Sequence, residues 1–286
     1  MNFSKNRNAN DLSELEKIIF PAAKGTTTNN RKHFKNVRAL FLSAFKEAKV
    51  GFVKRHLVWT YIARSLKKGI SQGKTLYEIE QPLRSFFRKR VDFEKETKPA
   101  INERSQKNFC KIKDFILGDR ILDLGAGDGL LAKQIASRMK KDVVLVDVVD
   151  YNFTKLPLLL YAQDGIIPLG DKSVDTTICY AVLHHSDDPV HVLKEATRVT
   201  SKRLILLEGY IEKEGILITN AFIDWYFNRV IRDADINVPF NYAKLDDWRE
   251  ILSSFGFNVI ESKYLGIDEP LAPEYHMLII ADRNIN

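Results

Sequence analysis

The sequence has few of the features that mark secreted or membrane-spanning proteins. Its 286 residues include two cysteines, Cys110 and Cys179, which are too few for a disulfide framework and lack the spacing of a metal-binding motif. No uninterrupted apolar run approaches the ~20 residues that cross a bilayer, and the N-terminus has no apolar signal core. No internal repeat of fixed period is present. We therefore expect a soluble, cytoplasmic protein without a metal site.

The charged residues divide the chain into two unlike parts. Residues 1–118 hold 26 Lys and Arg against 11 Asp and Glu, a net charge of +15, whereas residues 119–286 have a net charge of −8. Apolar residues recur at helical spacing between Lys35 and Lys68, with an interruption near Gly51, and again from Leu76 to Phe87. We predict a basic helical N-terminal region over residues 1–118, with a loop or flexible linker over residues 20–31.

A glycine turn at the start of the second part is its most informative stretch. The run Arg120-Ile121-Leu122 predicts a strand that runs into Asp123-Leu124-Gly125-Ala126-Gly127-Asp128-Gly129, and a helix with an apolar face follows. Glycines at a helix N-terminus let the backbone approach a nucleotide-like ligand. A dinucleotide fingerprint needs glycine or alanine at its sixth position, where this chain has Leu130. The pattern G-x-G-x-G therefore indicates a different cofactor.

Polar residues recur at the ends of the strands predicted after this turn. The apolar run 143–146 ends in Asp147, where a ribose would find an acceptor for its hydroxyls. Asp164 follows a short crossover, and the strand 176–183 leads into His184 and His185. The alternation of strands and helices over residues 119–286 predicts an α/β domain with a doubly wound, mostly parallel sheet. Ligands of such sheets bind beyond the carboxyl ends of the strands.

This order of motifs resembles the type 11 group of class I S-adenosylmethionine (SAM) methyltransferases. The resemblance implies a Rossmann-like fold, SAM as cofactor and S-adenosylhomocysteine as product. It implies that Asp123 faces the methionine end, that Asp147 binds the ribose, and that Asp164 accepts from the adenine amino group. The cofactor-binding residues that it implies are Asp123, Gly125, Ala126, Gly127, Gly129, Asp147, Val148, Asp164, Gly165, Tyr180, Ala181 and His184. The crossover between Asp147 and Asp164 contains Pro157, so we expect its usual helix to be reduced or lost.

An aromatic insertion over residues 209–243 separates the strand ending at Glu208 from the helix starting at Lys244. In the implied fold it lies beside the cofactor, so we predict a lid over the acceptor pocket. The residues expected to contact the acceptor are Trp225, Tyr226, Arg229 and Tyr242, with Glu208, Asp224 and Asp233 as further polar candidates. The alternative is that these aromatic residues only extend the core.

Two histidines are the candidate catalytic residues. Methyl transfer to a hydroxyl or ammonium needs a base, and imidazole titrates near neutral pH. His184 and His185 follow the strand at which the resemblance places the methyl donor. The alternative is that this pair lines the cofactor site.

The leading interpretation is transfer of a methyl group to a small organic molecule at oxygen, nitrogen or carbon. An RNA methyltransferase comes next, because the basic region 1–118 offers a surface for nucleic acid, and an enzyme that acts on a lipid-like acceptor at an anionic membrane surface follows. A SAM-binding regulatory or scaffold protein is the non-enzymatic alternative. The basic charges could equally form the solvated face of a helical cap, and no pattern indicates an oligomeric state.

Overall fold

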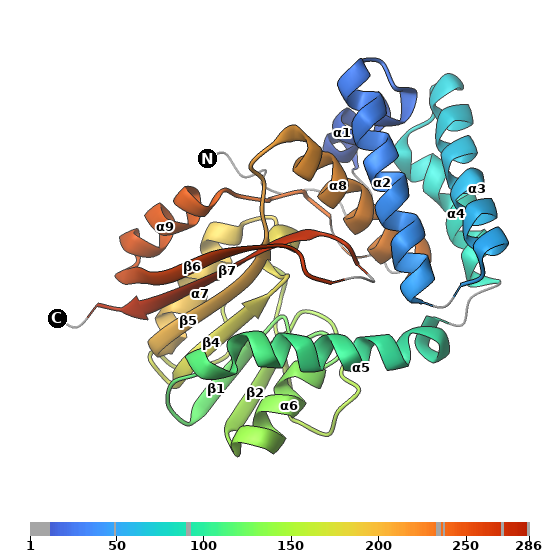
Figure 1. Ribbon diagram of the computed structural model, residues 1–286. Coiled ribbons are helices and arrows are strands. Elements are labelled where there is room, and N and C mark those ends of the chain that lie inside the picture. The colour runs from blue at the N-terminus through green and yellow to red at the C-terminus, as the bar shows by residue number, and fades with distance from the viewer. Residues whose placement is uncertain are drawn as a thin grey trace.

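A twisted β-sheet with helices packed against it forms one end of the protein, and a bundle of helices forms the other (Figure 1). The computed structural model describes residues 12–48, 50–89, 93–232, 236, 238–269 and 272–284, with the backbone alone for residues 93–100. In these parts of the chain, no helix is both long and apolar enough to cross a membrane.

The described residues form a seven-stranded sheet in the order β3-β2-β1-β4-β5-β7-β6. Its strands are β1 (Arg120–Leu124), β2 (Asp142–Asp147), β3 (Leu158–Leu160), β4 (Val174–Tyr180), β5 (Thr200–Gly209), β6 (Phe257–Ile267) and β7 (Tyr275–Arg283). The first five run parallel, and β7 pairs antiparallel with both β5 and β6. This is the predicted doubly wound, mostly parallel sheet. The crossover into β3 contains no helix, as the proline in it led us to expect.

Helices cover both faces of the sheet, as buried parallel strands require. α5 (Phe93–Ile112) and α6 (Leu130–Met139) pack on one face through Phe109, Ile112 and Ile135. α7 (Pro189–Val199) and α9 (Leu245–Ser254) pack on the other face through Leu193 and Trp248. Two 3₁₀ turns, η1 (Lys113–Phe115) and η2 (Leu183–His185), connect these layers. α5 precedes residue 118 in the chain but belongs to the layer that covers the sheet.

Four further helices make up most of the bundle: α1 (Ser13–Lys24), α2 (Thr28–Glu47), α3 (Phe52–Ser71) and α4 (Leu76–Arg88). The interruption predicted near Gly51 is present. The loop predicted over residues 20–31 is wrong, because Gly25 ends α1 with φ +64° and Thr27 caps α2 by accepting the N–H of Asn30. The stretch rich in glycine and threonine is therefore two helix ends that meet.

The aromatic insertion completes this bundle. It forms α8 (Glu214–Asp224) and a π-helical segment, η3 (Trp225–Ile231). Phe222, Trp225 and Tyr226 share one buried core with Phe41 and Trp59 of α2 and α3. Glu80 of α4 accepts hydrogen bonds from the Trp225 indole (2.9 Å) and the Arg229 guanidinium (2.6 Å). The N-terminal helices and the insertion thus fold around a single core, which we call the helical module.

Candidate functional site

A cavity of about 510 Å³ lies between the carboxyl ends of the parallel strands and the helical module. Its walls come from the glycine turn after β1, the ends of β2 and β4, helix α5 and the segment η3. Ten of the twelve cofactor residues predicted from the resemblance line it, together with His185. Gly129 and Gly165 do not.

The glycine turn gives a ligand room to approach the backbone. Gly125 and Gly127 have φ values of +68° and +53°, which residues with a Cβ rarely adopt. A Cβ built on Gly125 would lie 2.3 Å from Val182, whereas one on Gly127 would have nothing within 4 Å. The Gly127 backbone therefore faces open space in the cavity. Its N–H donates to Asp147 Oδ2 (2.8 Å), which holds the second carboxylate of the site against the turn.

Asp123 is the most perturbed acid of the cavity. It is 2% exposed, and its Oδ2 has no hydrogen-bond partner among the described residues. Burial raises the pKa of Asp123 to about 7, helped by the negative charges of Asp128 and Asp147. A buried carboxylate oxygen without a hydrogen-bond partner is suited to a cationic ligand. The methionine end of SAM carries such a charge, so this side chain fits the cofactor.

Asp164 shapes the opposite end of the cavity. It accepts hydrogen bonds from the Ser186 hydroxyl and from the Asp187 N–H (3.2 Å). These bonds tie the loop after β3 to the turn that follows η2. Gly165, its neighbour, contributes to the bend of the chain rather than to the cavity wall.

Helix α5 supplies cavity residues that our reading of the sequence missed. Ile101, Arg104, Ser105 and Asn108 recur every three or four residues along one side of α5 and line the cavity. Arg104 pairs with Glu269, whose other oxygen accepts from Asn108 Nδ2 (2.9 Å). The helical spacing of Arg104, Ser105 and Asn108 after Ile101 was the available signal. The high positive charge of residues 1–118 favoured an accessory region here instead.

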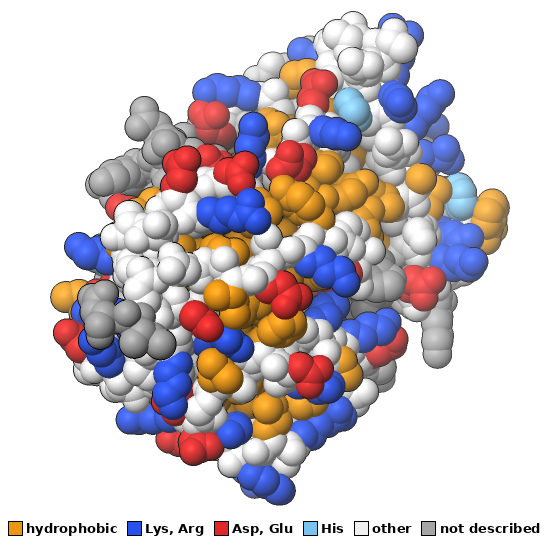
Figure 2. Space-filling model, turned by 60° about the vertical axis from the view of Figure 1, so that its left-hand side comes forward, with side chains coloured by type: hydrophobic (Ala, Val, Ile, Leu, Met, Phe, Trp, Pro, Cys, Tyr) orange, Lys and Arg blue, Asp and Glu red, His pale blue; other side chains and the backbone are white. Residues whose placement is uncertain are grey.

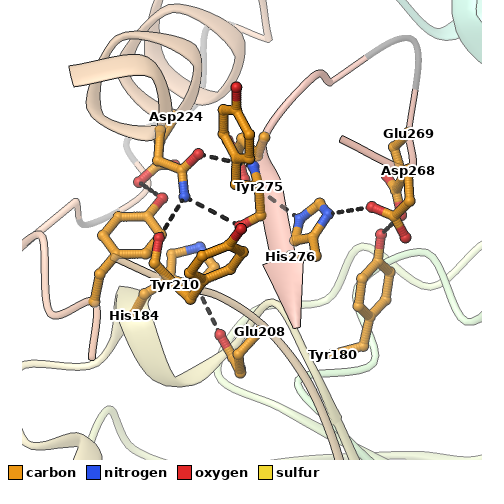
Figure 3. Close-up of polar contacts among 12 residues, drawn as sticks. Tyr180, His184, Glu208, Tyr210, Asp224, Asp268, Glu269, Tyr275 and His276 are labelled. Atoms are coloured by element: carbon orange, nitrogen blue, oxygen red, sulfur yellow. Dashed lines mark hydrogen bonds and ion pairs between the residues drawn. The ribbon is translucent and has the colours of Figure 1, made fainter. Parts of the chain in front are cut away.

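A second buried network flanks the cavity at the start of β7 (Figure 3). His276 Nδ1 bonds to Asp268 Oδ1 at 2.7 Å, and its Nε2 lies 3.7 Å from Glu274 Oε2. Burial alone would lower the pKa of His276, but its two carboxylate partners raise the pKa to about 10. Tyr180 at the end of β4 donates its hydroxyl to Glu269 beside this network.

His184 is held inside the protein by a carboxylate. Its Nδ1 bonds to Glu208 Oε2 at 2.7 Å, its ring stacks on Tyr242 at 4.8 Å, and it is 2% exposed. Burial opposes the charged ring, yet the hydrogen bond to Glu208 outweighs it and raises the pKa of His184. Glu208 also accepts from the N–H groups of Val182 and Leu183 (2.8 and 2.9 Å). The pair therefore fixes the turn after β4.

His185 is the more accessible of the two histidines. Its side chain is 23% exposed and its Nε2 lies 3.8 Å from Asp224 Oδ1, at the end of α8. Asp224 is fully buried and accepts from Asn228 Nδ2 (2.6 Å) and from the Tyr242 hydroxyl (3.3 Å). The potential metal-ligand atoms of His184, His185 and Asp224 lie within 4.8 Å of one another. Although no metal site was expected from the sequence, the described residues therefore contain one group with the composition of a metal site.

The structure corrects the choice of residues in the insertion. Trp225, Tyr226 and Arg229 lie in the core of the helical module and none of them lines the cavity. Tyr242 packs behind His184 instead of facing the cavity. The insertion residues that do line the cavity are Phe227, Asn228, Arg232 and Ile236. Asp233, another candidate, lies outside the described residues.

Together, the sheet order, the glycine turn and the cavity at the strand ends define a Rossmann-like domain with a cavity where such folds bind cofactors. Residues 122–206 match the model of a methyltransferase domain family. The chain therefore carries a class I SAM-dependent methyltransferase domain, and SAM is its cofactor.

Several solved structures are similar to this chain, and one of them superposes with a TM-score above 0.5. A SAM-dependent methyltransferase from Archaeoglobus fulgidus is 13% identical and superposes with a TM-score of 0.51, over 68% of this chain and 100% of that chain. A SAM-dependent methyltransferase from Aquifex aeolicus is 19% identical, with a TM-score of 0.44 over 70% and 98% of the two chains. Magnesium protoporphyrin IX methyltransferase from Synechocystis, solved with S-adenosylhomocysteine, is 17% identical with a TM-score of 0.46 over 68% and 89%. A search of curated proteins finds no match.

Proposed function

We propose that the enzyme methylates a small organic acceptor that binds between His185 and the segment η3. One observation carries this proposal: the cofactor residues and the insertion residues Phe227, Asn228 and Arg232 line the same cavity. A volume of about 510 Å³ lies within the range of sites for small molecules. An acceptor that shares this space with the cofactor must be small.

In this proposal, different residues of the cavity bind the cofactor and the acceptor. SAM supplies a methyl group that is transferred by in-line displacement, so the protein mainly has to hold the acceptor in line. Asp123, Asp147 and Asp164 would hold the cofactor. Phe227 offers an apolar surface to the acceptor, while Asn228 and Arg232 offer donors that orient it.

His185 is the proposed base for a hydroxyl or ammonium acceptor. It reaches the cavity, and the nearby Asp224 carboxylate would orient its ring and stabilise the positive charge that it gains with the proton. His184 serves a positioning role, because its Nδ1 is engaged by Glu208 and its raised pKa favours a ring that is already protonated.

The first experiment identifies the acceptor. Purified protein is incubated with SAM and pools of small metabolites, and mass spectrometry records which compound gains a methyl group while S-adenosylhomocysteine forms. Methylation of RNA alone, with steep loss of turnover as salt increases, would contradict the proposal. SAM binding without formation of S-adenosylhomocysteine under single-turnover conditions would favour the regulatory or scaffold alternative.

The second experiment tests the base with a matched pair of variants. His185→Gln should lower kcat by about 10²–10⁴-fold and leave the Kd for SAM unchanged. His184→Gln should instead lower the thermal stability, because Glu208 would remain buried without its charged partner. If His185→Gln keeps full turnover, the base lies elsewhere.

A further inference from the structure

Helices α2 and α3 carry an unusual excess of positive charge. These two 20-residue helices hold ten Lys and Arg and one acidic residue, Glu47. On α2, Arg31, Lys35, Arg38 and Lys46 are exposed at spacings of four, three and eight residues, which places them along one side of the helix. The stability of the fold does not require this row of exposed cations, since exposed charges contribute little to stability.

The described part of the chain supplies no carboxylate that neutralises these cations. Within the described residues, none of the ten Lys and Arg of α2 and α3 forms an ion pair with a carboxylate. Figure 2 shows Lys and Arg side chains gathered along the edge of the molecule over the N-terminal helices, with hydrophobic side chains exposed at the same edge. The described acidic residues therefore leave this face uncovered, and an external anion can pair with it.

The start of α3 exposes apolar side chains within this basic face. Phe52, Val53 and Leu57 are 66%, 68% and 64% exposed. On the same exposed side of α3, the spacing i, i+4, i+11, i+15 joins Val53 and Leu57 to Arg64 and Lys68. The exposed side of α3 is therefore apolar near the N-terminus of the helix and basic near its C-terminus. We call Phe52, Val53 and Leu57 the apolar tip.

An anionic bilayer can bind both the basic side chains and the apolar tip of this surface. Lys and Arg bind lipid phosphates and carboxylates, while exposed large apolar residues gain by entering the boundary between headgroups and acyl chains. Nucleic acid would satisfy the cations, but single strands are bound by aromatic stacking, which Val53 and Leu57 cannot provide. The same face of a second copy of the chain would bring the same positive charge and be repelled.

We propose that the exposed face of α2 and α3 docks the enzyme on an anionic phospholipid surface, with the apolar tip inserted among the headgroups. Arg55 supports the tip, because its guanidinium lies 5.3 Å from the Phe52 ring. α2 also packs against α8 of the insertion. Docking would therefore hold the wall of the acceptor cavity close to the membrane.

Flotation with lipid vesicles tests this inference. Vesicles of phosphatidylcholine with about 30 mol% phosphatidylserine should bind the full-length protein, and pure phosphatidylcholine vesicles should not. Replacing Lys54, Arg64, Lys67 and Lys68 by Gln should lower the partition coefficient at least about 100-fold, since each cation near the surface contributes several-fold. The triple variant Phe52→Ser, Val53→Ser and Leu57→Ser should lower it at least about 10-fold.

Matched controls separate this surface from general charge and hydrophobicity. A control variant with Lys133, Lys140, Lys194 and Lys263 changed to Gln has the same net charge, and Ile260→Ser removes an apolar side chain that is 54% exposed. Both controls should bind vesicles like the wild type. SAM binding and thermal unfolding, measured on every variant, verify that each one is folded and test the cofactor site independently of docking.

Four results would overturn the inference. The wild type could fail to bind the anionic vesicles, or the control variants could lose binding as strongly as the test variants. Loss of binding in the charge variant with full binding in the tip variant would show adsorption by charge without insertion. Tight binding of an RNA oligonucleotide by protein that ignores the vesicles would assign the basic face to nucleic acid instead.

Discussion

The raised pKa of the buried Asp123 carboxyl group predicts that the affinity for SAM depends steeply on pH. In the free protein the pKa of Asp123 is about 7, because the carboxyl group is buried near Asp128 and Asp147. The ionised form is the one that attracts the positive charges of SAM, and the bound cofactor in turn should lower this pKa. Binding therefore releases a proton below pH 7, and affinity rises with pH.

The size of the effect follows from the fraction of Asp123 that is ionised. With a pKa of about 7, this fraction is about 0.01 at pH 5 and about 0.75 at pH 7.5. If the pKa in the complex falls below 5, the affinity should rise about 75-fold over this range, or about 2.5 kcal/mol. The same linkage has the opposite sign for the free protein, whose stability should decline as pH rises from about 4 to about 7.

Titration calorimetry measures both quantities. The Kd for SAM is determined between pH 5 and 7.5, and buffers with different ionisation enthalpies report the number of protons released. Asp123→Asn should bind SAM more weakly at pH 7.5 and lose most of the pH dependence, whereas Asp114→Asn, at an exposed acid, should behave like the wild type. A Kd that changes less than threefold across this range would refute the reasoning.

Three further predictions concern stability and metal dependence. Glu80→Gln should lower the free energy of unfolding by about 3–5 kcal/mol, because Arg229 would remain buried and charged; chemical denaturation should give less than about 1 kcal/mol for Glu14→Gln at an exposed pair. The raised pKa of His276, about 10, adds stability that is complete below pH 6.5 and is lost as pH rises through 10. The melting temperature should fall over that range, and His276→Gln should start lower and fall less. Treatment with a chelator should leave turnover unchanged, since the proton favoured by the raised pKa of His184 competes with a metal ion; strict dependence on an added divalent cation would contradict this.

The sequence was sufficient to predict the sheet and the edge of the sheet at which the cavity lies. Strand ends and the glycine turn are local features, since each depends on a short run of residues and its immediate neighbours. Asp123, Asp147 and Asp164 could therefore be placed at the carboxyl edge of the sheet, and all three line the cavity. The break at Gly51 was predictable for the same reason.

The acceptor end could not be predicted in this way. Hydrophobic and polar residues are mixed on both sides of the segment 225–232, so hydrophobicity does not reveal which side faces the cavity. The segment is also π-helical, with hydrogen bonds from i to i+5, so the spacing of an α-helix assigns its side chains to the wrong side. Trp225 and Arg229 consequently pair with Glu80, which is more than 140 residues away in the chain and carries no local signal.

The shared core of the helical module has a consequence for how acceptor specificity can change. The region that matches the methyltransferase family, residues 122–206, lines one end of the cavity, whereas η3 lines the other end. Because η3 is fixed to α4 by a buried ion pair, residues 214–231 cannot be exchanged between enzymes without residues 12–89. A chimera that transfers residues 12–89 and 214–231 together would keep the core of the helical module intact. In divergent relatives these two distant stretches of sequence should therefore change in concert, while the cofactor domain between them changes independently.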